Sequence, residues 1–221
     1  KLALAVQLSC LPAAAIAADT QNKDEKAVET ITVRGQYTVN ETIDTATGLG
    51  LTLLETPQSV SVMTAQRIQD LDISSIADAV TQTPGLTSKA FDSTRNTFSA
   101  RGFDIDKFQL DGVPVAWSLA GDSGETITDV AIYERIEVVR GATGLLTGVG
   151  EPSASVNLVR KHANARELSG YINGGIGSWN KRVVNGDVTT PIDAAGNVRV
   201  RLVAKKELAD SFRDLAEEDK T

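Results

Sequence analysis

The sequence is poor in the residues from which most catalytic and metal sites are built. Its 221 residues include one cysteine, Cys10, and one histidine, His162. A single thiol excludes a disulfide framework, and a single imidazole excludes a His-rich metal site or a second histidine as a base. No G-x-S-x-G nucleophile elbow is present. These absences argue against an enzyme, and no metal ligands are expected.

Positive charge is also scarce. Lys and Arg number 22 against 29 Asp and Glu, a net charge of -7, so no basic surface is available to neutralise nucleic-acid phosphates. The glycine-spaced stretch "GATGLLTGVGEP" is not a phosphate loop. No Lys follows its last Gly as in a Walker motif, and Ser153 stands where the dinucleotide motif needs its third Gly. The polar segment around His162, residues 160–166, is interpreted as a solvated link.

Long apolar runs are missing too. The stretch from Leu2 to Leu11 is shorter than the roughly 20 residues of a membrane-spanning helix. Followed by Pro12 and an A-x-A site at residues 15–17, it is typical of a secretory signal peptide, predicted to cover residues 1–17. A lipoprotein signal at Cys10 is a weaker alternative. Cleavage near residue 17 would remove the only thiol.

Two stretches of contrasting composition follow. Residues 18–46 are rich in polar and charged residues and predict a flexible tail, in which Thr30 to Val33 is the only β-prone run. Residues 47–165 predict a compact α+β domain. Its expected elements are a strand at Val60 to Met63, a helix capped by Thr64, a helix burying Ile76, Ala79 and Val80, a hairpin turn at Asp111-Gly112, a turn of helix leading into a strand at Ile136 to Val139, and a strand at Ser155 to Val159.

Period-2 strands dominate residues 166–221. In "NVRVRLVAK" the apolar residues Val198, Val200 and Leu202 alternate with Arg199, Arg201 and other residues. Such strands suit either a half-buried antiparallel sheet or a membrane β-barrel with lipid outside and a wet lumen inside. The pattern alone leaves both open.

Five stretches, in order, resemble the TonB-dependent outer-membrane receptors, and most closely their ferric-siderophore branch. They are "ETPQSVSVMTAQRIQD", "TPGLTS", "FSARGFDIDKFQLDGVPV", "YERIEVVRGATGLLTGVGEPSASVNLVRKHA" and "GSWNKRVVNGDVTTPIDAAGNVRVRLVAKKELADSFRD". The resemblance implies an α+β plug domain followed by the first antiparallel strands of a 22-stranded transmembrane β-barrel. Three strands cannot close a barrel, so the chain is expected to be the N-terminal part of a longer receptor.

The resemblance also implies roles for particular residues. The pentapeptide Glu29, Thr30, Ile31, Thr32 and Val33 matches the TonB box, which pairs with the energy-transducing protein TonB as an added strand. Arg101, Glu137 and Arg140 match positions whose charges lock the plug to glutamates of the barrel wall. Outward loops at Ser88 to Phe98 and Val115 to Thr126 suggest Phe91, Arg95 and Trp117 as ligand contacts.

The expected function is import of a ferric siderophore across the outer membrane of a Gram-negative bacterium. Its partners are then TonB, the siderophore and membrane lipid, with the iron arriving already chelated. The short spacing between the predicted cleavage site and the TonB box predicts a transporter without a signalling domain. Two alternatives stay open: a receptor of the same class for cobalamin or a glycan, and a soluble secreted α+β binding module. The soluble module requires the late strands to bury their apolar face under the first domain.

Overall fold

The structure is a computed structural model that describes residues 42–43, 49–91, 95–116, 129–141, 151–193, 196–210 and 217–220, with Ala116 and residues 217–220 described by backbone alone. The chain divides into two units, Lys1–Val33 and Arg34–Thr221, and every described residue belongs to the second. The predicted signal peptide and TonB box therefore lie outside the described residues.

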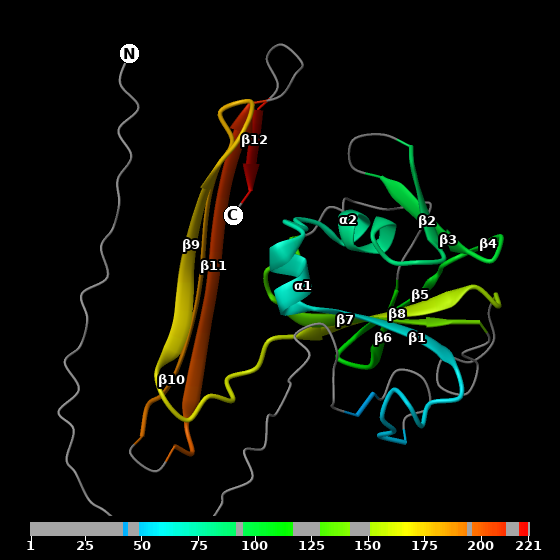
Figure 1. The fold of residues 1–221 in the computed structure, drawn as a ribbon, viewed down its shortest axis with the longest axis horizontal. Helices are drawn as coiled ribbons and strands as arrows, with labels where there is room; N and C mark the ends of the chain where they lie inside the picture. Colours follow the sequence, from blue (N-terminus) through cyan, green and yellow to red (C-terminus); the bar gives the residue numbers. More distant parts are fainter. Residues whose placement is uncertain are drawn as a thin grey trace, which may run out of the picture. The chain divides into compact units, whose positions relative to one another are not determined.

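A five-stranded sheet forms the centre of the predicted α+β domain (Figure 1). Its strand order is β1-β7-β8-β5-β6. The β5 and β8 strands run parallel, whereas the other neighbours are antiparallel. The strands are β1 (Ser59–Thr64), β5 (Lys107–Leu110), β6 (Val113–Ala116), β7 (Tyr133–Arg140) and β8 (Ala154–Arg160).

Two short helices are present, and the first begins at the predicted cap. Thr64 caps α1 (Ala65–Asp70), and its hydroxyl accepts a hydrogen bond from the Arg67 amide. Ser75 and Asp78 form a capping box at the start of α2 (Ile76–Thr81). Each cap satisfies backbone donors that a helix leaves unpaired at its first turn. Both predicted helices are confirmed.

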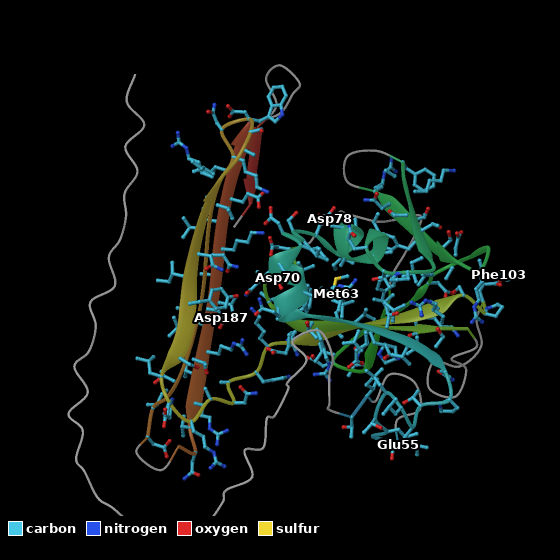
Figure 2. All side chains as sticks on the ribbon, in the orientation of Figure 1. Glu55, Met63, Asp70, Asp78, Phe103 and Asp187 are labelled. Carbon is cyan, nitrogen blue, oxygen red and sulfur yellow. The ribbon has the colours of Figure 1, made fainter. Side chains whose placement is uncertain are left out.

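The apolar core lies between these helices and one face of the sheet (Figure 2). Phe98 and Phe108 are fully buried, with ring centroids 6.1 Å apart and tilted by 49°. The face of α2 predicted to be buried does pack into this core. The cluster also includes Met63, Ile68, Ile73, Leu86, Ile105, Val130, Tyr133, Ile136, Val138, Val156 and Leu158.

The hairpin between β5 and β6 is confirmed in detail. Asp111 and Gly112 both have positive φ, 50° and 80°, as a type I′ turn requires. The Asp111 carboxylate accepts hydrogen bonds from the Arg160 amide, at 2.8 Å, and from Arg160 Nε, at 2.6 Å. The Gly112 amide donates to Asn157 Oδ1 at 2.9 Å. The turn is therefore fastened to β8.

Two predictions were wrong. The stretch Ser88 to Phe98, expected as an outward loop, is largely the hairpin of β2 (Leu86–Ala90) and β3 (Asn96–Ala100), to which the short β4 (Phe103–Asp104) adds a third strand. These strands carry mostly small polar residues, and only Leu86, Phe98 and Ala100 among them are buried in the core, so no apolar period-2 run marks them in the sequence. Residues 91–95 remain as the connection.

The second correction concerns the start of β7. No helical turn precedes it; instead, the Ala131 amide donates to Asp129 Oδ1 at 2.7 Å and the Tyr133 amide to the Val130 carbonyl at 3.1 Å. This side-chain turn competes with a helix for the same backbone donors. The strand therefore starts at Tyr133, three residues before the predicted Ile136.

A second, four-stranded sheet has the order β12-β11-β10-β9, and all of its neighbouring strands are antiparallel. Its strands are β9 (Ser169–Ile176), β10 (Arg182–Pro191), β11 (Arg199–Asp210) and β12 (Glu217–Lys220). Along β10 and β11 the side chains alternate strictly. Val184, Val188, Val200 and Leu202 are exposed on what we call the outer face, whereas Asp187, Arg201, Lys205 and Glu207 lie on the inner face.

Candidate functional site: a charged contact between the α+β domain and the four-stranded sheet

Asp187 on β10 is the centre of the contact. Its side chain, labelled in Figure 2, is 4% exposed. One of its oxygens lies 2.8 Å from Nζ of Lys161, the residue that directly follows β8. Arg201 on β11 binds both oxygens of the same carboxylate, each at 2.8 Å. The fork of a guanidinium suits this two-point binding. The carboxylate therefore joins a cation of the α+β domain to a cation of its own sheet.

Two further ion pairs cross from the α+β domain to the inner face. Arg201 Nη1 lies 3.1 Å from the Glu134 carboxylate and donates to the His162 carbonyl at 3.1 Å. Lys205 Nζ lies 2.6 Å from Asp129 and 3.4 Å from Glu207. The bridges meet two inner positions of β11, Arg201 and Lys205, which are separated on that face by Val203.

The buried bridge is more sensitive than the exposed one to the loss of one partner. Lys161 and Asp187 are 5% and 4% exposed, and removing one member of such a pair leaves a charge in a poorly solvated site. Glu134 is 46% exposed, where an ion pair contributes only about 0–1 kcal/mol. Loss of Lys161 or Asp187 is therefore expected to cost more than loss of Glu134.

A cavity of about 250 Å³ lies beside these bridges. Its lining is mixed, and one acceptor on it, Asn185 Oδ1, is buried without a hydrogen-bond partner among the described residues. A polar cavity of this size has room for several water molecules. The polar residues lining it are Gln69, Asp72, Asp129, Lys161, Tyr171, Asn173, Asn185 and Lys205.

The predicted lock residues separate into two groups. Arg140 uses its guanidinium inside the domain: Nε donates to the Pro84 carbonyl at 2.9 Å, Nη1 to Ser59 Oγ at 2.9 Å, and Nη2 to Ser61 Oγ. Burial lowers the pKa of Arg140, and the positive charge of Arg101 lowers it further. The two arginines are thus close to one another.

Arg101 is exposed and has φ 56°, in the left-handed region. Its guanidinium covers Gly141, where an added Cβ would lie 2.8 Å from Nη1. Arg101 and Arg140 therefore present two neighbouring positive charges. This arrangement fits an acidic partner, although the wall glutamates that they would bind remain a prediction.

Glu137 does not join these arginines. It lies three residues before Arg140 on β7, which places the two on opposite faces of the sheet. Its carboxylate is 1% exposed and accepts hydrogen bonds from Arg135 Nε at 2.6 Å and Asn157 Nδ2 at 3.2 Å. Within the described residues, Glu137 serves an internal network rather than the Arg101 and Arg140 pair.

The predicted ligand contacts are only partly described. Phe91 is 59% exposed, and Lys89 Nζ lies 5.4 Å from the centre of its ring. The Phe91 amide donates to the carbonyl of the exposed Arg95 at 2.9 Å, so both residues belong to the β2–β3 connection. Trp117 lies outside the described residues. The assignment of all three to ligand binding stays a prediction.

The sequence alone missed Lys161 and Asp187. The polar composition of the segment around His162 predicts a solvated link, but the side chain of Lys161 in it is buried against the second sheet. A signal was available: Asp187 shares the polar face of its strand with Asn185 and Thr189, and only an opposite charge makes a buried carboxylate there stable. What the sequence did not give was the partner.

The orientation of the late strands contradicts the soluble binding module. That alternative required the apolar face to be buried under the α+β domain, whereas the charged inner face makes the ion pairs and the apolar outer face is exposed.

Among the described residues, no helix has the length and apolar character needed to span a membrane. The same residues contain no cluster of three or more His, Cys, Asp or Glu suited to a metal ion.

Comparison with known proteins identifies the family that this arrangement resembles. The model of the TonB-dependent receptor plug domain matches residues 52–155. The chain is 46% identical, over 81% of its length, to the ferripyoverdine receptor of Pseudomonas aeruginosa, of which it covers 22%. It is 34% identical, over 78% of its length, to the ferrioxamine B receptor of Salmonella typhimurium, of which it covers 25%. The chain thus spans about a quarter of the length of these relatives.

Solved structures agree with the sequence comparison. The ferripyoverdine receptor of the outer membrane of Pseudomonas aeruginosa, bound to ferripyoverdine, matches 82% of this chain and 24% of its own, with a TM-score of 0.76 and 45% identity. The alcaligin outer membrane receptor of Bordetella pertussis matches 79% of this chain and 30% of its own, with a TM-score of 0.72 and 44% identity.

The five-stranded sheet with its two helices is therefore a receptor plug domain, matched over residues 52–155. The chain belongs to the TonB-dependent receptors and is similar to the N-terminal portion of their ferric-siderophore members. From here we call the α+β domain the plug domain.

Proposed function

We propose that the chain is the N-terminal part of an outer-membrane receptor that binds a ferric siderophore outside a Gram-negative cell and passes it to the periplasm. The observation that carries the proposal is the sorting of the late strands into an apolar outer face and a charged inner face paired with the plug domain. A wall strand between lipid and an enclosed plug requires this sorting. The names of the relatives supply the ligand class.

In this proposal β9 to β11 begin a 22-stranded transmembrane barrel that surrounds the plug domain. The Lys161 to Asp187 bridge fastens the plug to the first wall strands, and Arg101 with Arg140 meets wall glutamates from later strands. Phe91, Arg95 and Trp117 contact the chelate. The iron travels inside the siderophore as cargo, so the protein contributes polar and aromatic contacts rather than metal ligands.

In this proposal the segment Glu29 to Val33 couples the receptor to its energy-transducing partner. A β-prone run within a polar stretch offers backbone donors and acceptors to the edge of a partner's sheet, and Ile31 and Val33 lie on one face of the added strand. The partner is TonB. Transport then depends on this segment, whereas binding at the outer surface does not.

The test uses the full-length receptor in a Gram-negative strain that lacks its own siderophore receptors. Cells are given ⁵⁵Fe-labelled ferripyoverdine or ferrioxamine B, and surface binding is separated from uptake by removing the proton-motive force. We expect energy-dependent uptake of at least one chelate, and Val33→Pro to abolish uptake while leaving binding intact, because proline removes a backbone donor from the added strand. Thr32→Ser is the matched control.

Two results would overturn the proposal. Uptake of cobalamin with no response to ferric chelates would move the receptor to another ligand class. Loss of both binding and uptake in Val33→Pro, at normal receptor levels, would mean that the segment does not act as a partner strand.

A further inference from the structure

Trp179 lies in the turn between β9 and β10 with a backbone conformation that tryptophan rarely adopts. Its φ is 58°, and that of Asn180 is 51°. A two-residue turn with both angles positive favours Asn and Gly, so Asn180 fits its place and Trp179 does not. The indole is 62% exposed, so packing within the described residues does not explain its presence. A strained bulky residue of this kind points to a function for its side chain.

The turn is held rigidly at the end of the sheet. The Asp210 amide, at the end of β11, donates to the Trp179 carbonyl at 2.7 Å. The Asn180 side-chain amide donates to the Asp210 carboxylate. The Lys181 amide closes the turn onto the Ser178 carbonyl at 3.2 Å. The ring is therefore presented from a fixed backbone, at a fixed height relative to the strands.

The outer face ends at this turn. Its first row consists of Ile176, Arg182 and Leu208, and the pairing continues row by row to Ile192, whose amide donates to the Val198 carbonyl. From residue 182 to residue 192 the strand advances about 34 Å at ~3.4 Å per residue. A tilt of about 45° reduces this to roughly 24 Å, close to the ~25 Å height of an apolar band in a membrane barrel.

Charge on the outer face is confined to the same end. In the described strands β9 to β11, the outward-facing charged residues are Arg182, Lys206 and Asp210, all within two rows of the Trp179 turn. The rows beyond them carry Val188, Leu202 and other uncharged residues. Long cationic side chains are tolerated on a lipid-facing surface near its boundary, where their heads reach the headgroups.

We propose that Trp179, with Arg182 beside it, is a lipid anchor that sets the depth of the first hairpin in the bilayer. The occupant of this surface is the headgroup layer: the indole body lies on the acyl chains, its N–H donates to a lipid oxygen, and the guanidinium of Arg182 meets a phosphate. An amphipathic ring is suited to this boundary, which offers apolar contact on one side and hydrogen-bond acceptors on the other. The proposal rests on the proposed membrane location and adds the boundary and the residues that define it.

Depth measurements on the full-length receptor separate the two proposals. Spin labels are placed through Trp179→Cys, Leu202→Cys and Asp193→Cys in vesicles of phosphatidylethanolamine and phosphatidylglycerol, and collisions with oxygen and with a water-soluble nickel chelate are compared. Leu202 should be in the hydrocarbon, Asp193 in water, and Trp179 at headgroup depth. A label at 202 exposed to the nickel chelate would refute the membrane location itself. A label at 179 as exposed as that at 193, with 202 still buried, would overturn the anchor alone.

Two substitutions of Trp179 then test whether its indole ring binds lipid. Trp179→Asn relieves the backbone strain and removes the ring, whereas Trp179→Tyr keeps an amphipathic ring in the same backbone. If the ring binds lipid, Trp179→Asn should fold into vesicles severalfold more slowly than the wild type yet unfold in detergent at the same or a higher temperature. Trp179→Tyr should recover most of the folding rate.

Two results would contradict the anchor. An equal loss of stability for Trp179→Asn in detergent and in vesicles would mean that the ring packs on protein. A loss of ferric-siderophore affinity, with unchanged folding into vesicles, would assign the ring to ligand binding.

Discussion

Lys161 Nζ lies 2.8 Å from Asp187 Oδ2, and each side chain is at least 95% buried. Lys161 directly follows β8, the last strand of the plug domain, and Asp187 is in the middle of β10 in the four-stranded sheet. The plug domain is thus joined to the four-stranded sheet by a charge pair placed next to the link between them. A charge pair is directional, so it fixes position as well as contributing attraction.

Removal of the Lys161 charge should loosen this fastening. Lys161→Met keeps most of the side-chain volume but leaves Asp187 with Arg201 alone, and we expect a loss of about 1–3 kcal/mol in the free energy of unfolding. Urea unfolding of the full-length receptor in detergent measures it. The exposed Arg166→Met is the control and should change stability by less than about 0.5 kcal/mol. If Lys161→Met and Asp187→Leu simply add when combined, the two residues are not coupled.

Asp111 should make the plug domain sensitive to acid. Burial of its carboxyl raises the pKa, but hydrogen bonds from Arg160 and the charges of Arg160 and His162 outweigh burial, so the net pKa is lowered from 3.8. The stabilisation is complete above the unfolded-state pKa and is lost as the pH falls through the lower folded-state value. We expect this part of the stability to disappear below about pH 4.

Asp111→Asn tests that expectation because Asn-Gly also suits the turn. The variant should be less stable than the wild type at pH 7, and the difference should shrink as the pH falls from 4 to 2. Thermal unfolding across this range measures it. A constant difference at every pH would exclude the ionised carboxylate as the cause.

Alanine substitutions at Gly141 and Gly102 form a matched pair that tests whether the position of the Arg101 guanidinium matters. Both have positive φ, 105° and 86°, so alanine strains the backbone at either place by about 1–2 kcal/mol. At Gly141 the new Cβ would meet the Arg101 guanidinium, at 2.8 Å, whereas at Gly102 no atom of the described residues lies within 4 Å.

If Arg101 binds the barrel wall, Gly141→Ala should displace it and reduce uptake, while Gly102→Ala lowers stability without the same loss. Thermal unfolding gives the stability of each variant, and ⁵⁵Fe uptake normalised to receptor level gives the transport effect. Equal uptake by both variants would remove the support for a lock at Arg101.

Arg140→Lys should destabilise the plug domain although the charge is kept. The guanidinium reaches the Pro84 carbonyl and the hydroxyls of Ser59 and Ser61 at once, and a lysine ammonium cannot match this geometry. Losing hydrogen bonds from a charged donor costs about 1.5–3 kcal/mol. Urea unfolding checks this. Ser59→Ala should cost little once Lys replaces Arg140, and an undiminished effect would mean that the serine acts through another contact.

Much of the fold was readable from short-range signals. Thr64 and Ser75 start helices because their side chains cap unpaired amides, and Asp111-Gly112 turns the chain because both residues accept positive φ. Each of these signals acts between residues that are close in the sequence. The β2–β3 hairpin was missed because its outward positions carry Thr, Ser and Lys, so the buried Leu86, Phe98 and Ala100 did not stand out as a period-2 pattern.

The candidate site was readable only in part. The alternating pattern places Arg201 on the polar face of its strand, and in the structure it binds Glu134. Glu137 resembled a lock residue by position, yet the structure pairs it with Arg135 and Asn157 inside the domain. A local pattern gives the face on which a charge lies but does not identify a partner distant in the sequence.

The sequence by itself determined where helices, turns and alternating strands occur, because capping, positive φ and period-2 burial act between close neighbours. Tertiary structure alone decided which charges meet. The pairing of Lys161 with Asp187, and the placement of Arg182 and Lys206 at the Trp179 end of the outer face, depend on the register between β9, β10 and β11. A shift of one residue in that register would turn every charge to the opposite face.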